Sequence, residues 1–280
     1  MSGNSNFMKN FSILLLFFLL TPSFAHASSN EKVSLPVPFI WEIPDGVWVP
    51  PWSGACEEAS IMAVEGYYLK KPKKILSKTE AKNAMSPLFA IENKIFGYNT
   101  DTTAAETALL INDYTSYDAK VVDNPTLDDI KAELRAGRPV ITVHYGYDLK
   151  NPRHRFRRGG SSYHVMALVG FDDAKGEFLV NDSEMNDGID FRYKYATIMD
   201  TLHDFNHATK KADGPARAIF TQNKNIWKAV GSSRIFLVRN GKKHYISSPA
   251  VFKKHRWSWS LVKMVDKSKL DELENGNTIN

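Results

Sequence analysis

Helical patterns come first in this chain and strand patterns follow, which restricts the fold more than any other feature of the sequence. The helical patterns cover residues 55–69, 78–85, 103–114 and 127–136. Strand patterns begin after Gly137 and cover residues 139–145, 163–171, 176–181, 189–195 and 216–221, with one short helix at 196–205. Helices that precede strands, instead of alternating with them, predict an α+β fold in which helices pack on an antiparallel sheet.

Three of the helix starts carry residues that suit the N-cap position. Ser53 is expected to cap the first helix, Asp101 or Thr102 the third, and Thr126 the fourth. Their side-chain oxygens can accept a hydrogen bond from a backbone N–H that has no partner inside the helix.

The segment from residue 225 to residue 280 has short strand patterns of its own. Residues 234–239 and 242–247 flank Asn240-Gly241, and Asn-Gly between two alternating segments is the strongest short-range signal for a β-hairpin. We therefore expect a small β-rich C-terminal module over residues 225–280, preceded by a larger domain over residues 28–224. The module either encloses a site or binds a surface.

Residues 1–27 have the pattern of a secretory signal peptide. Lys9 supplies the positive charge, residues 11–20 form the apolar stretch, and Ala-His-Ala at 25–27 fits the cleavage site. The apolar stretch is shorter than the roughly 20 residues that a membrane-spanning helix needs. We expect cleavage and a secreted protein, extracellular or periplasmic, with no later transmembrane segment.

The formal net charge of +5 is mild, and part of it is concentrated in a basic loop at residues 150–158. No nucleic-acid-binding motif accompanies this loop, so nucleic acid is not an expected partner. The loop is either a solvated basic segment or a patch for an anionic partner such as a cell-wall or envelope polymer.

Cys56 is the only cysteine of the chain, and it lies at the start of the first predicted helix. A single cysteine in an exported protein has no internal disulfide partner, so its thiol is open to another role. His164 lies on a predicted strand, and Asp182 follows the next strand. A thiol at a helix N-terminus, an imidazole that carries a proton and a carboxylate that orients it are the parts of a cysteine-peptidase site.

Each of these three residues also has a purely structural alternative. Cys56 taken alone is typical of a buried small apolar residue, His164 of a hydrogen-bonded strand histidine, and Asp182 of a turn cap. Their order along the chain and their places on a helix and two strands favour the catalytic interpretation when the three are taken together.

Five segments carry a resemblance to a known family. They are Val-Pro-Phe-Ile-Trp-Glu at 37–42, Ala-Cys-Glu-Glu-Ala-Ser at 55–60, Gly-Arg-Pro-Val-Ile at 137–141, Tyr-His-Val-Met-Ala-Leu-Val-Gly-Phe-Asp at 163–172 and Asn-Asp at 181–182. Over roughly residues 33–200 the chain resembles the papain-fold cysteine peptidases related to bacteriocin-processing, double-glycine-leader peptidases, and more closely their stand-alone secreted relatives.

This resemblance implies a papain-like fold and assigns roles to the three residues. Cys56 would be the nucleophile, His164 the general base and acid, and Asp182 the residue that orients the histidine. The C-terminal module is similar, more weakly, to small repeat-like modules of bacterial surface proteins.

Two places depart from the family pattern. The family commonly has a glutamine where this chain has Glu42, and the amide of that glutamine helps to form the oxyanion hole. An ionised Glu42 would repel the oxyanion, and losing one such donor costs about 10²–10³ in rate; a protonated Glu42 or another donor is the alternative. Relatives usually have Gly-Pro where this chain has Glu57-Glu58, and these two carboxylates are expected to raise the pKa of the thiol.

No metal site and no cofactor are expected from the sequence. His203 and His207 have an i, i+4 spacing, but the glutamate of a His-Glu-x-x-His zinc protease is missing. A solvated helix end is the expected structure there.

The sequence therefore predicts an exported cysteine peptidase that hydrolyses peptide bonds of a peptide or protein substrate through a Cys-His-Asp triad and a thioester. Two alternatives stay open. One is a catalytically degenerate papain-fold protein that binds at the cell surface, which Glu42 and the Glu57-Glu58 pair motivate. The other is a thiol amidase or acyltransferase, in which the thioester passes its acyl group to an amine.

Overall fold

The computed structural model describes residue 1 and residues 30–154 and 162–280. The predicted signal peptide therefore lies, except for its first residue, outside the described residues, and so do residues 155–158 of the basic loop. Among the helices that the structure describes, none combines the length and the apolar character that a membrane span requires.

Within the described residues of the first half of the chain, four helices have nine or more residues, as the sequence predicts. They are α1 (Cys56–Tyr68), α2 (Lys78–Ile95), α3 (Ala104–Tyr114) and α4 (Leu127–Arg135). Thr126 caps α4 as expected, with its side chain accepting from the Asp129 N–H. The α3 cap is Thr103, not Asp101 or Thr102, because Thr103 and Glu106 form a reciprocal capping box.

The predicted cap of α1 is wrong. Ser53 lies in a short 3-10 turn, Trp52–Gly54, and the N-cap position belongs to Ala55, which has no side-chain oxygen. The turn brings the chain into the helix without a polar cap, so the backbone N–H groups of the first turn of α1 have no side-chain partner at the N-cap position.

Seven of the described strands form one antiparallel sheet. Its strands are β1 (Lys32–Ser34), β2 (Tyr117–Asp123), β3 (Val140–Tyr145), β4 (Tyr163–Asp172), β5 (Glu177–Asn181), β6 (Phe191–Lys194) and β7 (Arg217–Asn223). The spatial order is β2-β7-β3-β4-β5-β6, and β1 pairs with the end of β4. A short helix, α5 (Tyr195–Asp200), follows β6 and ends earlier than residue 205, the end that the sequence pattern predicts.

The central strand β4 is buried along all ten of its residues. Successive side chains of a strand point to opposite faces, so both faces of the sheet are covered at this strand. Both α1 and α4 pack against β4, and the Ser60 hydroxyl of α1 donates a hydrogen bond to the Val165 carbonyl 3.3 Å away. This contact fixes the first turns of α1 beside the first residues of β4.

Gly170 allows β1 to join the sheet at the far end of β4. A Cβ atom at this position would lie 2.2 Å from the Val33 carbonyl oxygen, which excludes any side chain. The register of β4 against β5 shifts between Leu168 and Gly170, at the same point. This irregularity lets one strand serve two partners without disturbing the first half of β4.

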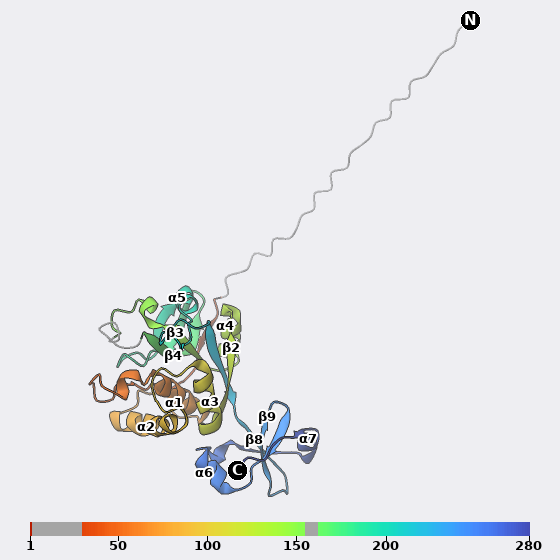
Figure 1. The fold of residues 1–280 in the computed structure, drawn as a ribbon. Coiled ribbons are helices and arrows are strands. Elements are labelled where there is room, and N and C mark those ends of the chain that lie inside the picture. The colour runs from red at the N-terminus through yellow and green to blue at the C-terminus, as the bar shows by residue number, and fades with distance from the viewer. Residues whose placement is uncertain (2–29, 155–161) are drawn as a thin grey trace.

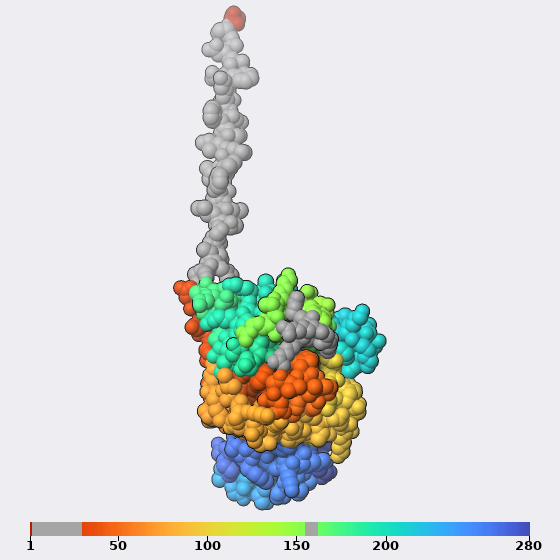
Figure 2. All heavy atoms as spheres, turned by 90° about the vertical axis from the view of Figure 1, so that its left-hand side faces the viewer, coloured from red at the N-terminus to blue at the C-terminus, as the bar shows by residue number. Residues whose placement is uncertain are grey.

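The C-terminal module has a second sheet of five described strands. They are β8 (Asn225–Ala229), β9 (Ile235–Arg239), β10 (Lys242–Tyr245), β11 (Val262–Val265) and β12 (Glu274–Asn275), with the short helices α6 (Pro249–Lys254) and α7 (Lys267–Asp271) beside them. The predicted hairpin at Asn240-Gly241 is confirmed: both residues have positive φ, as a type I′ turn requires. The module forms one end of the molecule in Figures 1 and 2.

A buried ion pair holds the module against the rest of the chain. Lys224 connects β7 to β8, and its Nζ lies 3.0 Å from Asp118 Oδ1, which also accepts from Arg239 at 2.8 Å. Lys224 itself is fully buried. The α+β fold that the order of patterns predicts is therefore confirmed, while the domain boundary between residues 224 and 225 stays a prediction.

Candidate active site

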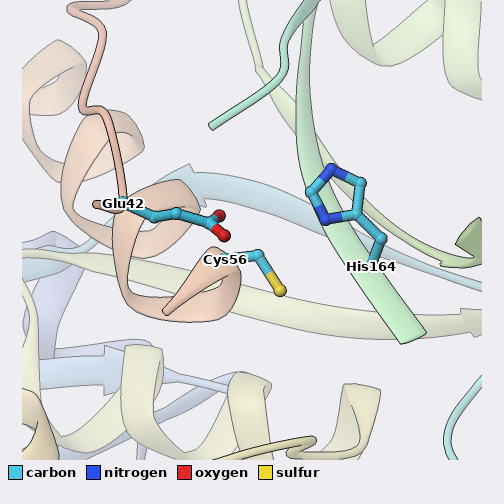
Figure 3. Close-up of side chains that lie close together, drawn as sticks. All are labelled: Glu42, Cys56 and His164. Atoms are coloured by element: carbon cyan, nitrogen blue, oxygen red, sulfur yellow. The ribbon is translucent and has the colours of Figure 1, made fainter. Parts of the chain in front are cut away.

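Cys56 is the first residue of α1, and the preceding chain returns beside it at Glu42 (Figure 3). Cys56 is largely buried, with 6% of its surface exposed to solvent. Its backbone N–H belongs to the first turn of the helix, where N–H groups have no acceptor inside the helix. A helix start of this kind favours negative charge near the sulfur.

His164 faces Cys56 from the second position of β4. Its Nε2 lies 2.9 Å from Oδ1 of Asp182, the residue that directly follows β5. With Nε2 held by the carboxylate, the other ring nitrogen, Nδ1, is the one turned toward Cys56 and Glu42 in Figure 3. The structure therefore brings the three residues of the predicted triad together in the predicted order.

Glu42 joins the same cluster through two contacts with Ser183. The Glu42 backbone N–H donates to the Ser183 carbonyl at 3.1 Å, and the Ser183 hydroxyl donates to Glu42 Oε2 at 2.6 Å. A carboxylate oxygen of Glu42, Sγ of Cys56 and a ring nitrogen of His164 all lie within 4.8 Å of one another. The residue that stands in place of the family's glutamine thus lies beside the nucleophile.

His164 and Asp182 stabilise each other's charged forms. Burial alone would lower the pKa of His164, but the charge and hydrogen bond of Asp182 outweigh it and raise this pKa to about 9. Burial likewise opposes ionisation of Asp182, yet His164 and His154 hold the pKa of this carboxyl far below its ordinary value. At neutral pH Asp182 is a carboxylate and His164 an imidazolium.

Around the thiol, in contrast, burial favours the neutral forms of the titratable groups. Burial raises the pKa of the Cys56 thiol well above its ordinary value, and the charges of Glu57 and Glu42 raise it further. Burial also raises the pKa of Glu42 to about 8, with the charge of Glu184 as the next cause. The lowered thiol pKa that a helix start favours is therefore wrong for the resting structure. The rise expected from the two glutamates is found for Glu57, whereas Glu58 is not among its causes.

Glu57 contacts the thiol directly. The Cys56 Sγ donates a hydrogen bond to Glu57 Oε2 at 2.9 Å, and the Thr102 backbone N–H donates to Glu57 Oε1 at 2.9 Å. The carboxyl is buried, which raises its pKa to about 8. Glu57 is therefore a second titratable neighbour of the nucleophile.

Two residues that the sequence did not single out for the site complete the surroundings of Asp182. His154 Nε2 lies 2.7 Å from Asp182 Oδ2, and the Tyr193 hydroxyl donates to the same oxygen at 2.6 Å. His154 lies in the basic loop and Tyr193 on β6, and both are buried. The histidine of the basic loop was visible in the sequence, but no pattern tied it to Asp182.

His203 and His207 lie elsewhere and form no metal cluster among the described residues. His203 Nδ1 is 3.1 Å from the Gly214 carbonyl, and His207 Nε2 is 3.0 Å from Glu106 Oε2. The expected helix end is also wrong, because residues 203–207 are not helical and an i, i+4 spacing has no meaning there.

A profile of the Peptidase C39-like family matches residues 35–212, which is more than half of the chain. A crystal structure of a C39-like peptidase from Bacillus anthracis is 15% identical, with a TM-score of 0.44, and the match covers 69% of this chain and 98% of that one. No curated protein sequence matches. The family match agrees with the papain-like fold that the resemblance implied, and this protein belongs to the Peptidase C39-like family.

Proposed function

We propose that this protein is an exported cysteine peptidase that cleaves peptide bonds through a thioester on Cys56. The family match supports a peptidase. The catalytic roles are supported by the arrangement of Asp182, His164 and Cys56. Nε2 of His164 lies 2.9 Å from Oδ1 of Asp182, and a ring nitrogen of His164 and a carboxylate oxygen of Glu42 lie within 4.8 Å of the Cys56 sulfur. Export rests on the predicted signal peptide at residues 1–27.

Because the pKa of His164 is raised to about 9, His164 must first release its Nδ1 proton to solvent, and only a minor fraction of the enzyme has done so at neutral pH. Acylation begins in that fraction, when the Cys56 proton moves to Nδ1 of neutral His164 and the thiolate attacks the substrate carbonyl carbon. The new C–S bond forms while the carbonyl electrons move to oxygen. The imidazolium then donates its Nδ1 proton to the amine nitrogen as the C–N bond breaks. Asp182 supports this step because its charge favours the protonated ring.

Deacylation repeats the sequence with water. Neutral His164 takes a proton from the water that attacks the thioester carbon, and the C–S bond breaks as the carboxylic acid leaves. The proton on Nδ1 returns to the sulfur, which restores the thiol. Each proton that His164 accepts is therefore given back within the same half-reaction.

Glu42 serves in this proposal as a carboxylic acid that donates to the oxyanion. Its Oε2 accepts from Ser183, which leaves Oε1 to carry the acid proton. The pKa of about 8 keeps the group protonated at neutral pH, so it donates where an ionised carboxylate would repel. The backbone N–H of Cys56 is the second donor. This arrangement favours an active enzyme over the degenerate binding protein.

Hydrolysis of a peptide mixture by the mature protein tests the proposal. We expect new peptide termini with the wild type, none with Cys56→Ala, and a loss of about 10²–10³ in rate with Glu42→Ala. Product masses separate hydrolysis, which adds water, from acyl transfer to an amine. Absence of turnover in both the wild type and Glu42→Gln would leave the binding protein as the better explanation.

A further inference from the structure

Three side chains of the site offer the donor types that a zinc ion prefers. Cys56 offers a sulfur, His164 a ring nitrogen and Glu42 a carboxylate oxygen, and these three atoms lie within 4.8 Å of one another. Two ligands of one tetrahedral zinc ion lie about 3–4 Å apart, because each bond is about 2.0–2.3 Å long. Small side-chain rotations would bring the three atoms onto one ion.

His154, His164 and Asp182 form a second group of possible metal ligands, but the atoms that would bind an ion are already hydrogen-bonded to one another. His154 and His164 each direct Nε2 to a different oxygen of Asp182, at 2.7 and 2.9 Å. These are hydrogen-bond lengths with a proton between the atoms, which leaves no room for an ion. The geometry therefore selects the cluster of Glu42, Cys56 and His164.

The surroundings of this cluster suit a divalent cation in two further ways. His164 uses Nε2 for Asp182, and a carboxylate behind a histidine ligand fixes the ring and raises its basicity toward a metal. Glu57 and Glu184 are buried nearby, at 1% and 3% exposure, and a bound dication would favour the ionised form of Glu57 over the neutral form that burial favours.

We infer that the catalytic cysteine, His164 and Glu42 form a zinc-binding site that holds the enzyme in a reversibly inhibited state. The ion would take Sγ of Cys56, Nδ1 of His164 and one oxygen of Glu42, with a water molecule as the fourth ligand. Binding releases the protons of the ligands to solvent, and no other bond changes. The inhibition, though not the binding, rests on the proposed function.

Glu42 is the residue that distinguishes this site from an ordinary Cys-His pair. A glutamine in the same place offers only a neutral amide oxygen, which is a weaker zinc ligand than a carboxylate. The same substitution keeps a donor for the oxyanion. Glu42→Gln is therefore expected to lose zinc affinity, a loss that a metal titration reports independently of peptide hydrolysis.

Cobalt titration of the mature protein reports the binding without reference to activity. We expect one Co²⁺ per chain with a sulfur-to-metal charge-transfer band, and its displacement by Zn²⁺, in a buffer with a non-thiol reductant. Replacing an outer-shell partner costs about 10–100-fold in metal affinity, so we expect that loss for Asp182→Asn and at least as much for Glu42→Gln. His207→Asn removes the surface His207–Glu106 pair and is the matched control, with unchanged affinity.

Peptide hydrolysis measured in the presence of Zn²⁺ tests the inhibition. We expect zinc to inhibit the wild type and to slow alkylation of Cys56, with full recovery on chelation, and expect Mg²⁺ to have no effect. A cobalt complex without a sulfur band, or the same zinc affinity in the wild type and Glu42→Gln, overturns the site. A sulfur-bound cobalt complex in a protein that never hydrolyses peptides leaves the site standing and removes the proposed function instead. Should Glu42→Gln not fold, Asp182→Asn gives the same test.

Discussion

The sulfur of Cys56 lies 2.9 Å from Oε2 of Glu57, so the nucleophile hydrogen-bonds to the side chain of its own chain neighbour. A second hydrogen bond, from the Thr102 backbone N–H, holds that carboxyl in place. One hydrogen bond thus joins the thiol and the carboxyl. The resting thiol is stabilised against ionisation, and the charge of Glu57 is the largest cause of this after burial.

Glu57→Gln should therefore make the thiol more reactive. Removing the charge that Glu57 carries above its pKa of about 8 lowers the pKa of Cys56, and we expect alkylation by iodoacetamide at pH 9 to become about 10-fold faster, which corresponds to one pKa unit. The measurement is the alkylation rate as a function of pH. Glu58→Gln, one residue further on, is the control and should change the rate far less. An unchanged or slower reaction in Glu57→Gln would contradict this role.

Glu42 should set the alkaline limit of activity. The free enzyme loses its acidic oxyanion donor as Glu42 ionises, while neutral His164 accumulates up to its own pKa of about 9, so kcat/KM of the wild type is expected to fall above about pH 9. An amide does not ionise, and in Glu42→Gln this decline should move to higher pH, while kcat at neutral pH is retained or raised. Identical alkaline limbs in the two proteins would show that Glu42 does not act as an acid.

Local patterns were sufficient to predict the parts of the site that lie on regular elements. Cys56 could be predicted because a helical pattern begins beside it, and His164 and Asp182 because each lies on or next to a buried strand. The order of helices before strands was sufficient for the fold class. These features depend on neighbours in the sequence, which a single sequence displays.

Features that depend on distant contacts escaped the sequence. His154 reaches Asp182 from an irregular loop, 28 positions away, and no periodicity marks such a contact. Strand β2 was missed because it is an edge strand, with charged and partly exposed residues that give no continuous apolar pattern. Helix α2 was predicted too short because Pro87 interrupts its pattern, although the helix continues to Ile95.

His154 and Tyr193 should act on catalysis through Asp182. Both donate to Oδ2, and loss of either donor frees the carboxylate that orients His164. We expect His154→Ala and Tyr193→Phe each to lower kcat about 10-fold with little change in KM. In a double-mutant cycle, partners of one network show a coupling of about 0.5–3 kcal/mol. Strictly additive effects would contradict a shared positioning role.

The stability of the protein should fall between pH 6.5 and 8. Glu42 and Glu57 have pKa values raised by burial from 4.5 to about 8, so the folded state binds more protons than the unfolded chain in this range. Their stabilising effect is complete below pH 4.5 and is lost as the pH rises through 8. His164, raised from 6.5 to about 9, has the same sign. We expect a loss of a few kcal/mol, on the order of 10 °C in Tm.

His144 and Lys224, two other buried groups with shifted pKa values, do not contribute in this window. Burial lowers the pKa of His144 to about 3, so it affects stability only below its unfolded value of 6.5. Lys224, lowered by burial to about 8, acts above that pH. Thermal unfolding across the window is the measurement, and Glu58→Gln, which replaces another buried acid, should flatten the decline. A Tm that is constant or rises from pH 6.5 to 8 would contradict the assignment of buried, protonated carboxyls.

The decisive measurement is the intact mass of the protein after acid quenching during turnover of an activated peptide ester. The thioester mechanism predicts an adduct of one acyl group that maps to Cys56, forms in the wild type, accumulates when deacylation is slowed, and is absent from Cys56→Ala. Peptide products without any adduct on Cys56, or equal turnover by Cys56→Ala, would contradict the assignment of this cysteine as the nucleophile.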